Sequence, residues 1–212
     1  AAFAVKSVKR TDKNRSPSPP FTTSTMQQEA SRKLNITPRR TMAIAQQLYE
    51  GVDITGEGTV GLITYMRTDS LNLSNLAINA ISKEIKTSLG DKYLKIRKYH
   101  TSSKGAQEAH EAIRPTYVEK HSIEGTTNEK RLYNLIWKRT VASQMADAEI
   151  EKTTATITVS NRSEAFSATG EVIQFDGFLK VYIESRDDDS TGDSSDILPA
   201  MTQGEELKAN SI

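Results

Sequence analysis

The sequence predicts an α+β fold in which a helical domain is inserted into an antiparallel β domain. Three observations predict this class. Residues 3–9 alternate in the manner of a strand, apolar residues then recur at helical spacing, and β-rich segments return from residue 153 onward. We therefore expect a β domain that combines residues 1–24 and 151–212, with a helical domain formed by residues 25–150 between its two parts.

The first two helices of the helical domain are predicted from their caps. Ser24 or Thr25 can cap a helix that runs to about Leu34, with a capping box formed by a following Gln or Glu. Thr37, followed by a proline at the first helical position, caps a second helix that ends at Gly51. Residues 11–20, between the first strand and these helices, are rich in Lys, Ser and Pro, so we expect an irregular connection there.

The two helices are joined by residues 35–37, and this short pairing resembles a helix-turn-helix. The shape is common among proteins, so it is only a weak sign of DNA binding. Arg32 and Lys33 lie near the joint, where they can contact a phosphate backbone or can simply form a solvated helix face. The sequence leaves both interpretations open.

The rest of the chain contains packing elements. Ser74 is expected to cap a helix whose apolar stripe ends before Gly90, and the longest helical pattern covers residues 128–150 with Trp137 as a large anchor. We interpret both helices as core. The C-terminal part has three expected strands, at residues 155–159, 166–173 and 178–183.

The composition is that of a globular protein without a membrane span. Charged residues make up 26% of the 212 residues, and no apolar run reaches the roughly 18 residues that a transmembrane helix needs. The chain contains no cysteine, which excludes disulfides and thiolate metal sites and suits a cytoplasmic location. The opening residues are charged too soon for a secretory signal and lack an initial methionine, so we expect a piece of a longer protein.

The net charge of +1 conceals an uneven distribution. Residues 1–40 hold nine Lys or Arg against Asp12 and Glu29, whereas residues 184–212 hold eight Asp or Glu against two basic residues. The basic end is therefore the better candidate for contact with phosphate. We interpret the acidic run Asp187–Asp189 as a solvated loop rather than a metal site.

One segment, residues 61–70 (GLITYMRTDS), begins as a buried strand and turns polar within a few residues. Tyr65 and Arg67 are two residues apart, so they share a face if the backbone is extended. A tyrosine hydroxyl, with an ordinary pKa of about 10, is a weak nucleophile near neutral pH, and a nearby guanidinium that stabilises negative charge would help it. The alternative is a half-buried tyrosine beside a solvated charge, which is the commoner arrangement.

A second polar group, His110 with Arg114, precedes Pro115. The two residues are four positions apart, so they share a face whether the chain is helical or extended, and they can converge on one anion. A lone histidine is more often structural than catalytic. Spacing alone leaves both roles open.

Three blocks of sequence together resemble the bacterial type IA DNA topoisomerases, specifically the topoisomerase I branch. They are residues 20–31 (PFTTSTMQQEAS), 61–70 (GLITYMRTDS) and 110–116 (HEAIRPT), and they agree with the family in order and spacing. The sister topoisomerase III branch usually has proline where this chain has Met66. The resemblance covers essentially the whole chain and implies the middle of the enzyme, where a helical domain carrying the active-site tyrosine interrupts an antiparallel β arch.

The resemblance implies a role for each matching residue. Tyr65 would be the nucleophile that cuts one DNA strand and holds its 5′ phosphate, Arg67 would stabilise charge on the phosphoryl oxygens, and His110 would lie close to the scissile phosphate. Arg114 would lie in the DNA-binding cleft. Supporting groups at the same end of the strand, ranked lower and expected to belong to the DNA-binding surface, would be Thr64, Thr68, Asp69 and Ser70.

The implied activity is ATP-independent relaxation of negatively supercoiled DNA through a 5′-phosphotyrosine intermediate. The family also uses an acidic, Mg²⁺-binding TOPRIM domain, and no matching Asp-x-Asp pattern between a strand and a helix occurs here. We therefore expect the Mg²⁺ site outside this chain and no cofactor within it. The expected partners are single-stranded DNA and the missing TOPRIM and other domains of the same polypeptide. This piece alone should bind single-stranded DNA without relaxing supercoils.

Two alternatives belong to other classes of protein. A non-catalytic, helix-turn-helix-like DNA-binding module would use Tyr65 to stack on a base. A purely structural β/helical interaction protein would show no salt-dependent DNA binding at all.

Overall fold

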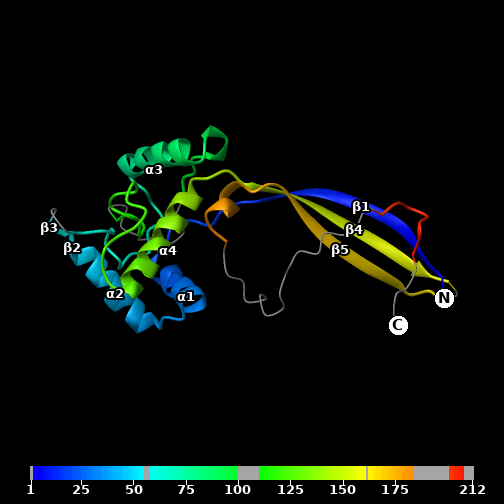
Figure 1. Cartoon of the computed structure of the whole chain (residues 1–212), viewed down its shortest axis with the longest axis horizontal. Coiled ribbons are helices and arrows are strands. Elements are labelled where there is room, and N and C mark those ends of the chain that lie inside the picture. The colour runs from blue at the N-terminus through cyan, green and yellow to red at the C-terminus, as the bar shows by residue number, and fades with distance from the viewer. Residues whose placement is uncertain (1, 55–57, 100–109, 161, 184–200, 208–212) are drawn as a thin grey trace. The chain divides into compact units, whose positions relative to one another are not determined.

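A computed structural model describes residues 2–54, 58–99, 110–160, 162–183 and 201–207 (Figure 1). The chain divides into two compact units. The β unit contains Ala1–Arg15, Ala148–Asp176 and Asp187–Ile212, and the helical unit contains Ser16–Asp147 and Gly177–Arg186.

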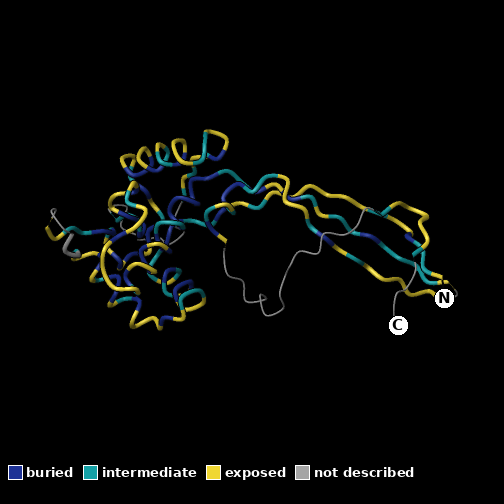
Figure 2. Tube along the Cα trace, in the orientation of Figure 1, coloured by how far each residue is buried: buried dark blue, intermediate teal, exposed yellow. Residues whose placement is uncertain are grey.

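The β unit is a four-stranded antiparallel sheet. Its strands are β1 (Phe3–Arg15), β4 (Ala148–Val159), β5 (Ala165–Phe175) and β6 (Glu206–Leu207), in the order β5-β4-β1-β6. Most of its side chains are half-buried or exposed (Figure 2), and the buried ones, such as Val5, Ile150 and Ala155, lie on the two central strands. The sheet is thus built mainly from the long pairings of β4 with β1 on one side and with β5 on the other.

The helical unit contains four α helices among the described residues. They are α1 (Thr23–Leu34), α2 (Pro38–Glu50), α3 (Asn75–Ser88) and α4 (Thr127–Ser143). Its shorter elements are the hairpin of β2 (Val52–Ile54) with β3 (Gly58–Val60) and the 3₁₀ turns η1 (Asp91–Tyr93) and η2 (Gly177–Lys180). Buried residues gather inside this unit (Figure 2). The largest fully buried side chains include Phe21, Met26, Leu48, Leu62, Met66, Ile113, Leu132 and Tyr133.

The predicted α+β class is confirmed, and most differences lie at element boundaries. Caps at Thr37 and Ser74 are confirmed, but α1 begins earlier than expected, because Thr22 is its N-cap and forms a capping box with Thr25. The long helix ends at Ser143, and the chain then enters β4. The helical unit begins at residue 16 rather than 25.

The strand expected at residues 178–183 is instead η2 and the residues that follow it, and these belong to the helical unit. Phe178 and Tyr182 are buried there. Gly177, with φ of +49°, approaches the chain so closely that an added Cβ would lie 2.2 Å from the carbonyl oxygen of Asp147. Only glycine fits this contact, which bends the chain into the turn.

No helix in the described part of the chain combines the length and the hydropathy needed to cross a membrane.

Candidate functional site

Backbone hydrogen bonds bring the three sequence blocks together within the helical unit. Thr23 N donates to Thr68 O at 2.9 Å, Ile113 N donates to Phe21 O at 2.8 Å, and Thr64 N donates to the carbonyl oxygen of Arg114 at 2.9 Å. Each block is therefore bonded to at least one of the other two. The expected strand before Tyr65 is reduced to one isolated bridge, between Ile63 and Pro115, and the amide of Leu62 donates instead to Leu48 O in α2.

Thr64 holds the backbone next to Tyr65. Its hydroxyl donates to the carbonyl oxygen of Ala112 at 2.7 Å and accepts from the amide of Arg114 at 3.0 Å. Together with the backbone bond from Thr64 N, these contacts fix Thr64 on both its main chain and its side chain. Thr64 is thus a positioning residue for the tyrosine that follows it.

The Tyr65 ring lies at an open surface among other rings. Tyr65 is 41% exposed, and its ring meets the Tyr49 ring in a T-shaped arrangement with 5.3 Å between ring centroids. The His110 ring lies 6.5 Å from the Tyr65 ring on the same measure. Ring pairs at such distances stabilise one another while leaving part of each ring accessible. The phenol therefore stands in a cluster that is ordered yet open to a ligand.

Tyr49 is a member of this cluster that the sequence did not indicate. Its place in the apolar stripe of α2 predicts burial, yet it is 41% exposed. The available signal is its position at the end of α2, one residue before Glu50 and two before the C-cap Gly51, where a helix face leaves the core. Spacing within one helix cannot reveal a ring contact with a residue 16 positions later.

Thr23 anchors the turn that carries Arg67. Its hydroxyl donates to Met66 O at 2.8 Å and to Thr68 O at 3.1 Å, and it accepts from the Thr68 amide at 2.9 Å. Met66 is buried below this turn, while Arg67 is exposed. The Arg67 side chain thus extends from a turn whose flanking residues, Met66 and Thr68, are both hydrogen-bonded to Thr23.

The other polar residues of the block divide into anchors and an exposed group. Thr68 and Ser70 are buried, and their hydroxyls accept backbone amide hydrogens from Ser70 at 3.0 Å and from Asn72 at 3.1 Å. Asp69 is exposed. Thr68 and Ser70 therefore stabilise the loop, and a DNA-binding role for these three residues stays a prediction.

His110 and Arg114 have different neighbours, although their spacing allowed them to converge on one anion. His110 lies near the Tyr65 ring. The side chain of Arg114 is 13% exposed, bonds to Glu111 through Nε (3.3 Å) and Nη2 (2.6 Å), and donates from Nη1 to Pro115 O at 2.9 Å. The described contacts of the Arg114 side chain are thus with its own segment, and its place in a DNA-binding cleft stays a prediction.

Glu111 is the ion-pair partner of Arg114, which the spacing of His110 and Arg114 did not indicate. Burial by itself raises its pKa, but hydrogen bonds from Arg114 and Ser74 outweigh burial and bring the pKa below the ordinary value of 4.5. The carboxylate is therefore ionised at neutral pH and balances the charge of Arg114.

Arg32 and Lys33 lie in the last turn of α1 beside a buried carboxylate. Both form ion pairs with Glu29, at 3.7 Å and 3.6 Å, and the Lys33 ammonium lies 4.0 Å from the centroid of the Tyr182 ring. The Tyr182 hydroxyl donates to Glu29 at 2.7 Å. These contacts stabilise the end of α1, and the predicted DNA contact of Arg32 and Lys33 is untested by them.

In the described part of the chain, no three His, Asp or Glu side chains gather in a way that could hold a metal ion.

Comparison with known proteins identifies the class. A family model described as DNA topoisomerase matches residues 1–212. DNA topoisomerase 1 of Rickettsia bellii is 47% identical over 99% of this chain, and that of Rickettsia felis is 46% identical over the same share. The solved structure of full-length topoisomerase I from Thermotoga maritima superposes with a TM-score of 0.81 over 98% of this chain, at 36% identity.

This chain belongs to the bacterial DNA topoisomerase family, and these three relatives are of the topoisomerase I type. The predicted resemblance is thereby confirmed. The chain spans only 27% and 28% of the two Rickettsia relatives and 32% of the Thermotoga chain.

Proposed function

We propose that this chain is the central part of a type IA DNA topoisomerase I and that Tyr65 is its nucleophile. The observation that carries the proposal is the Tyr65 side chain, which is exposed among rings and next to the anchored turn of Arg67, in a chain that the DNA topoisomerase family model matches over residues 1–212. A phenol in such a place is open to a phosphodiester, whereas a tyrosine buried in the core is not.

In the proposed reaction, the Tyr65 oxygen attacks the phosphorus of one DNA strand as the phenol loses its proton. The bond from phosphorus to the 3′ oxygen breaks, that oxygen takes up a proton, and the 5′ phosphate stays on Tyr65. After the other strand has passed through the break, the 3′ hydroxyl attacks the phosphotyrosine and restores the original bond. The energy of the phosphodiester is retained throughout, so ATP is not required.

Arg67 and His110 are the proposed partners of the phosphate. A guanidinium can donate two parallel hydrogen bonds to phosphoryl oxygens, and Arg67 is exposed for such a contact. His110, beside the Tyr65 ring, would orient the same phosphate or the adjoining backbone. Arg114, Arg32 and Lys33 are retained as proposed contacts to DNA farther from the reacting phosphorus, with Asp69 at the exposed loop.

The metal that the family implies has no site among the described residues, because these offer no cluster of carboxylate or imidazole ligands. We propose that Mg²⁺ binds in the TOPRIM domain of the complete polypeptide, and no step above depends on it. The purified chain should accordingly bind single-stranded DNA without relaxing negative supercoils. We also propose that the complete protein is located in the cytoplasm.

The test uses the complete protein that contains this chain. Wild type incubated with end-labelled single-stranded DNA and stopped with detergent should yield a covalent protein–DNA adduct, and Tyr65→Phe should yield none. Tyr49→Phe is the matched control, because it removes one hydroxyl from a neighbouring ring with the same 41% exposure. An adduct that persists in Tyr65→Phe, or is lost only in Tyr49→Phe, would show that the nucleophile is misassigned. A wild type that binds DNA but forms no adduct would favour the non-catalytic binding module.

A further inference from the structure

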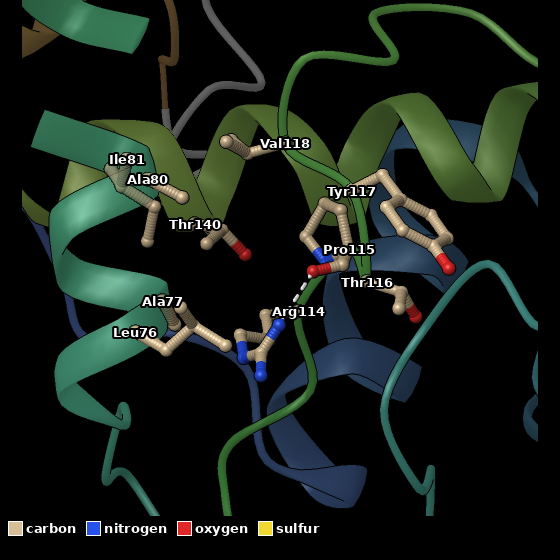
Figure 3. A pocket seen from close by; sticks show the side chains of 10 residues that line it. All are labelled: Leu76, Ala77, Ala80, Ile81, Arg114, Pro115, Thr116, Tyr117, Val118 and Thr140. Carbon is tan, nitrogen blue, oxygen red and sulfur yellow. Dashed lines mark hydrogen bonds between the residues drawn. The ribbon is translucent and has the colours of Figure 1, made fainter. Parts of the chain in front are cut away.

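A cavity of about 230 Å³ lies within the helical unit, lined by α3, α4 and residues 114–118 (Figure 3). Its walls are mostly apolar and are formed by Leu76, Ala77, Ala80, Ile81, Pro115 and Val118. Figure 3 shows Tyr117 and Thr116 pointing away from its centre. Leu76 and Ala80 are exposed on α3, so the cavity opens to the surface beside them.

One buried hydroxyl at this cavity lacks a partner. Thr140 is 1% exposed, and among the described residues its Oγ1 is the buried side-chain oxygen without a hydrogen bond. A threonine inside a helix can return its hydroxyl to a carbonyl of the preceding turn, but this one does not. Figure 3 shows the hydroxyl directed toward the open centre of the cavity. Since unpaired buried hydroxyls are costly and rare, the cavity is the place to look for the missing partner.

Arg114 supplies the second polar group. Within the described part of the chain, three of its five N–H groups are used, two on Glu111 and one on Pro115 O, so two donors remain. Its positive charge is already balanced by the ionised Glu111 carboxylate. A second anion placed here would be repelled by Glu111. The polar part of the cavity therefore suits a neutral hydrogen-bond acceptor better than a carboxylate or a phosphate.

We propose that this cavity binds a small neutral molecule that combines an apolar body with a carbonyl-type acceptor. Pockets for drug-sized ligands measure about 300–1,000 Å³, so the occupant should be smaller, of about the size of benzamide. The space also exceeds what one water molecule occupies, which is about 30 Å³ in the liquid. The apolar walls hold the body of the ligand, and its acceptor takes the Thr140 hydroxyl hydrogen and an N–H of Arg114.

Arg114 and Thr64 form one link between the cavity and the segment that carries Tyr65. The amide of Arg114 donates to the Thr64 hydroxyl at 3.0 Å, and Thr64 N donates back to the Arg114 carbonyl at 2.9 Å. A ligand on Arg114 thus contacts the residue whose main chain is hydrogen-bonded to Thr64, the residue before Tyr65. An effect of the ligand on DNA cleavage rests on the proposed function, whereas its binding does not.

Binding is tested with benzamide and the complete protein by ligand-observed saturation-transfer NMR. Wild type should show saturable binding. Thr140→Val keeps the shape but removes the hydroxyl, so it should weaken binding about 5- to 10-fold, the usual contribution of one hydrogen bond. Ala80→Phe should abolish binding by filling the mouth of the cavity. Thr127→Val makes the same chemical change at an exposed position of α4 and should bind as wild type does.

The outcomes decide the proposal. Benzoate should bind more weakly than benzamide because of the Glu111 charge, and benzoate binding as tightly would overturn the assigned ligand class. Absence of saturable binding, equal affinity in Thr140→Val, or a crystal structure grown with benzamide that shows only water on Thr140 would overturn the site. The melting temperature of each variant shows that it is folded. The covalent adduct assay for Tyr65 is independent, so either proposal can fail while the other stands.

Discussion

Replacing Thr64 with valine tests whether the contacts beside Tyr65 hold the site together. The substitution removes a hydroxyl that donates to Ala112 O at 2.7 Å and accepts from Arg114 N at 3.0 Å, while the backbone bond from Thr64 N remains. Each lost hydrogen bond costs about 0.5–1.5 kcal/mol, and stranding a buried partner adds to this. Ala112 is fully buried. We therefore expect a loss of about 2–3 kcal/mol in the free energy of unfolding of the helical unit.

Urea unfolding of the 212-residue chain, followed by tryptophan fluorescence, measures this loss directly. The single tryptophan, Trp137, lies in α4 and so reports on the helical unit alone. Thr64→Ser keeps the hydroxyl and should recover most of the stability, and Thr127→Val should change it by less than about 0.5 kcal/mol. A Thr64→Val chain as stable as wild type would refute the reasoning, as would Thr64→Ser losing as much as valine does.

Three further predictions concern charge and packing. Arg67→Ala should change the free energy of unfolding by less than about 0.5 kcal/mol, because the side chain is exposed. The same substitution should reduce the yield of covalent adduct in the complete protein, and a normal yield would show that Arg67 does not take part in cleavage. The pKa of Glu111 is lowered in the folded state, so its ion pair with Arg114 stabilises the chain above pH 4.5, and this stabilisation is lost as the pH falls through the lower folded-state pKa. In that pH range, the free energy of unfolding measured with urea should depend less on pH in Glu111→Gln than in wild type. The same pH dependence in both proteins would contradict the prediction. Phe21→Ala should cost about 3–5 kcal/mol, against about 1 kcal/mol or less for the same change at exposed Phe166; similar losses would contradict the burial argument.

Cap residues and apolar spacing predicted the helices well, and the errors lie within single elements. Thr37 and Ser74 stand alone as cap residues before apolar stripes, so their assignment is unambiguous. Residues 22–25 offer four consecutive hydroxyls, and the sequence cannot tell which of them accepts the helix amide. The strand expected at 178–183 failed because Phe178 and Tyr182, the two buried residues, are four apart, which is a helical spacing hidden in an alternating apolar segment.

The site was predictable in its residues but not in its geometry. A run that turns from apolar to polar indicated that Tyr65 and Arg67 leave the core, and both are exposed. The contact of Tyr65 with Tyr49 and His110, and the pairing of Thr64 with Arg114 across 50 positions, arise from tertiary packing. Spacing within one segment carries no information on such contacts. For the same reason, the four-residue spacing of His110 and Arg114 did not predict that His110 lies near Tyr65 while Arg114 pairs with Glu111.

The hydroxyl of Thr23 couples the first turn of α1 to the loop that carries Arg67. Because this hydroxyl bonds to both Met66 and Thr68, a small rotation of the first turn of α1 would move the main chain on both sides of Arg67. The position from which the Arg67 side chain extends is therefore set by the start of α1.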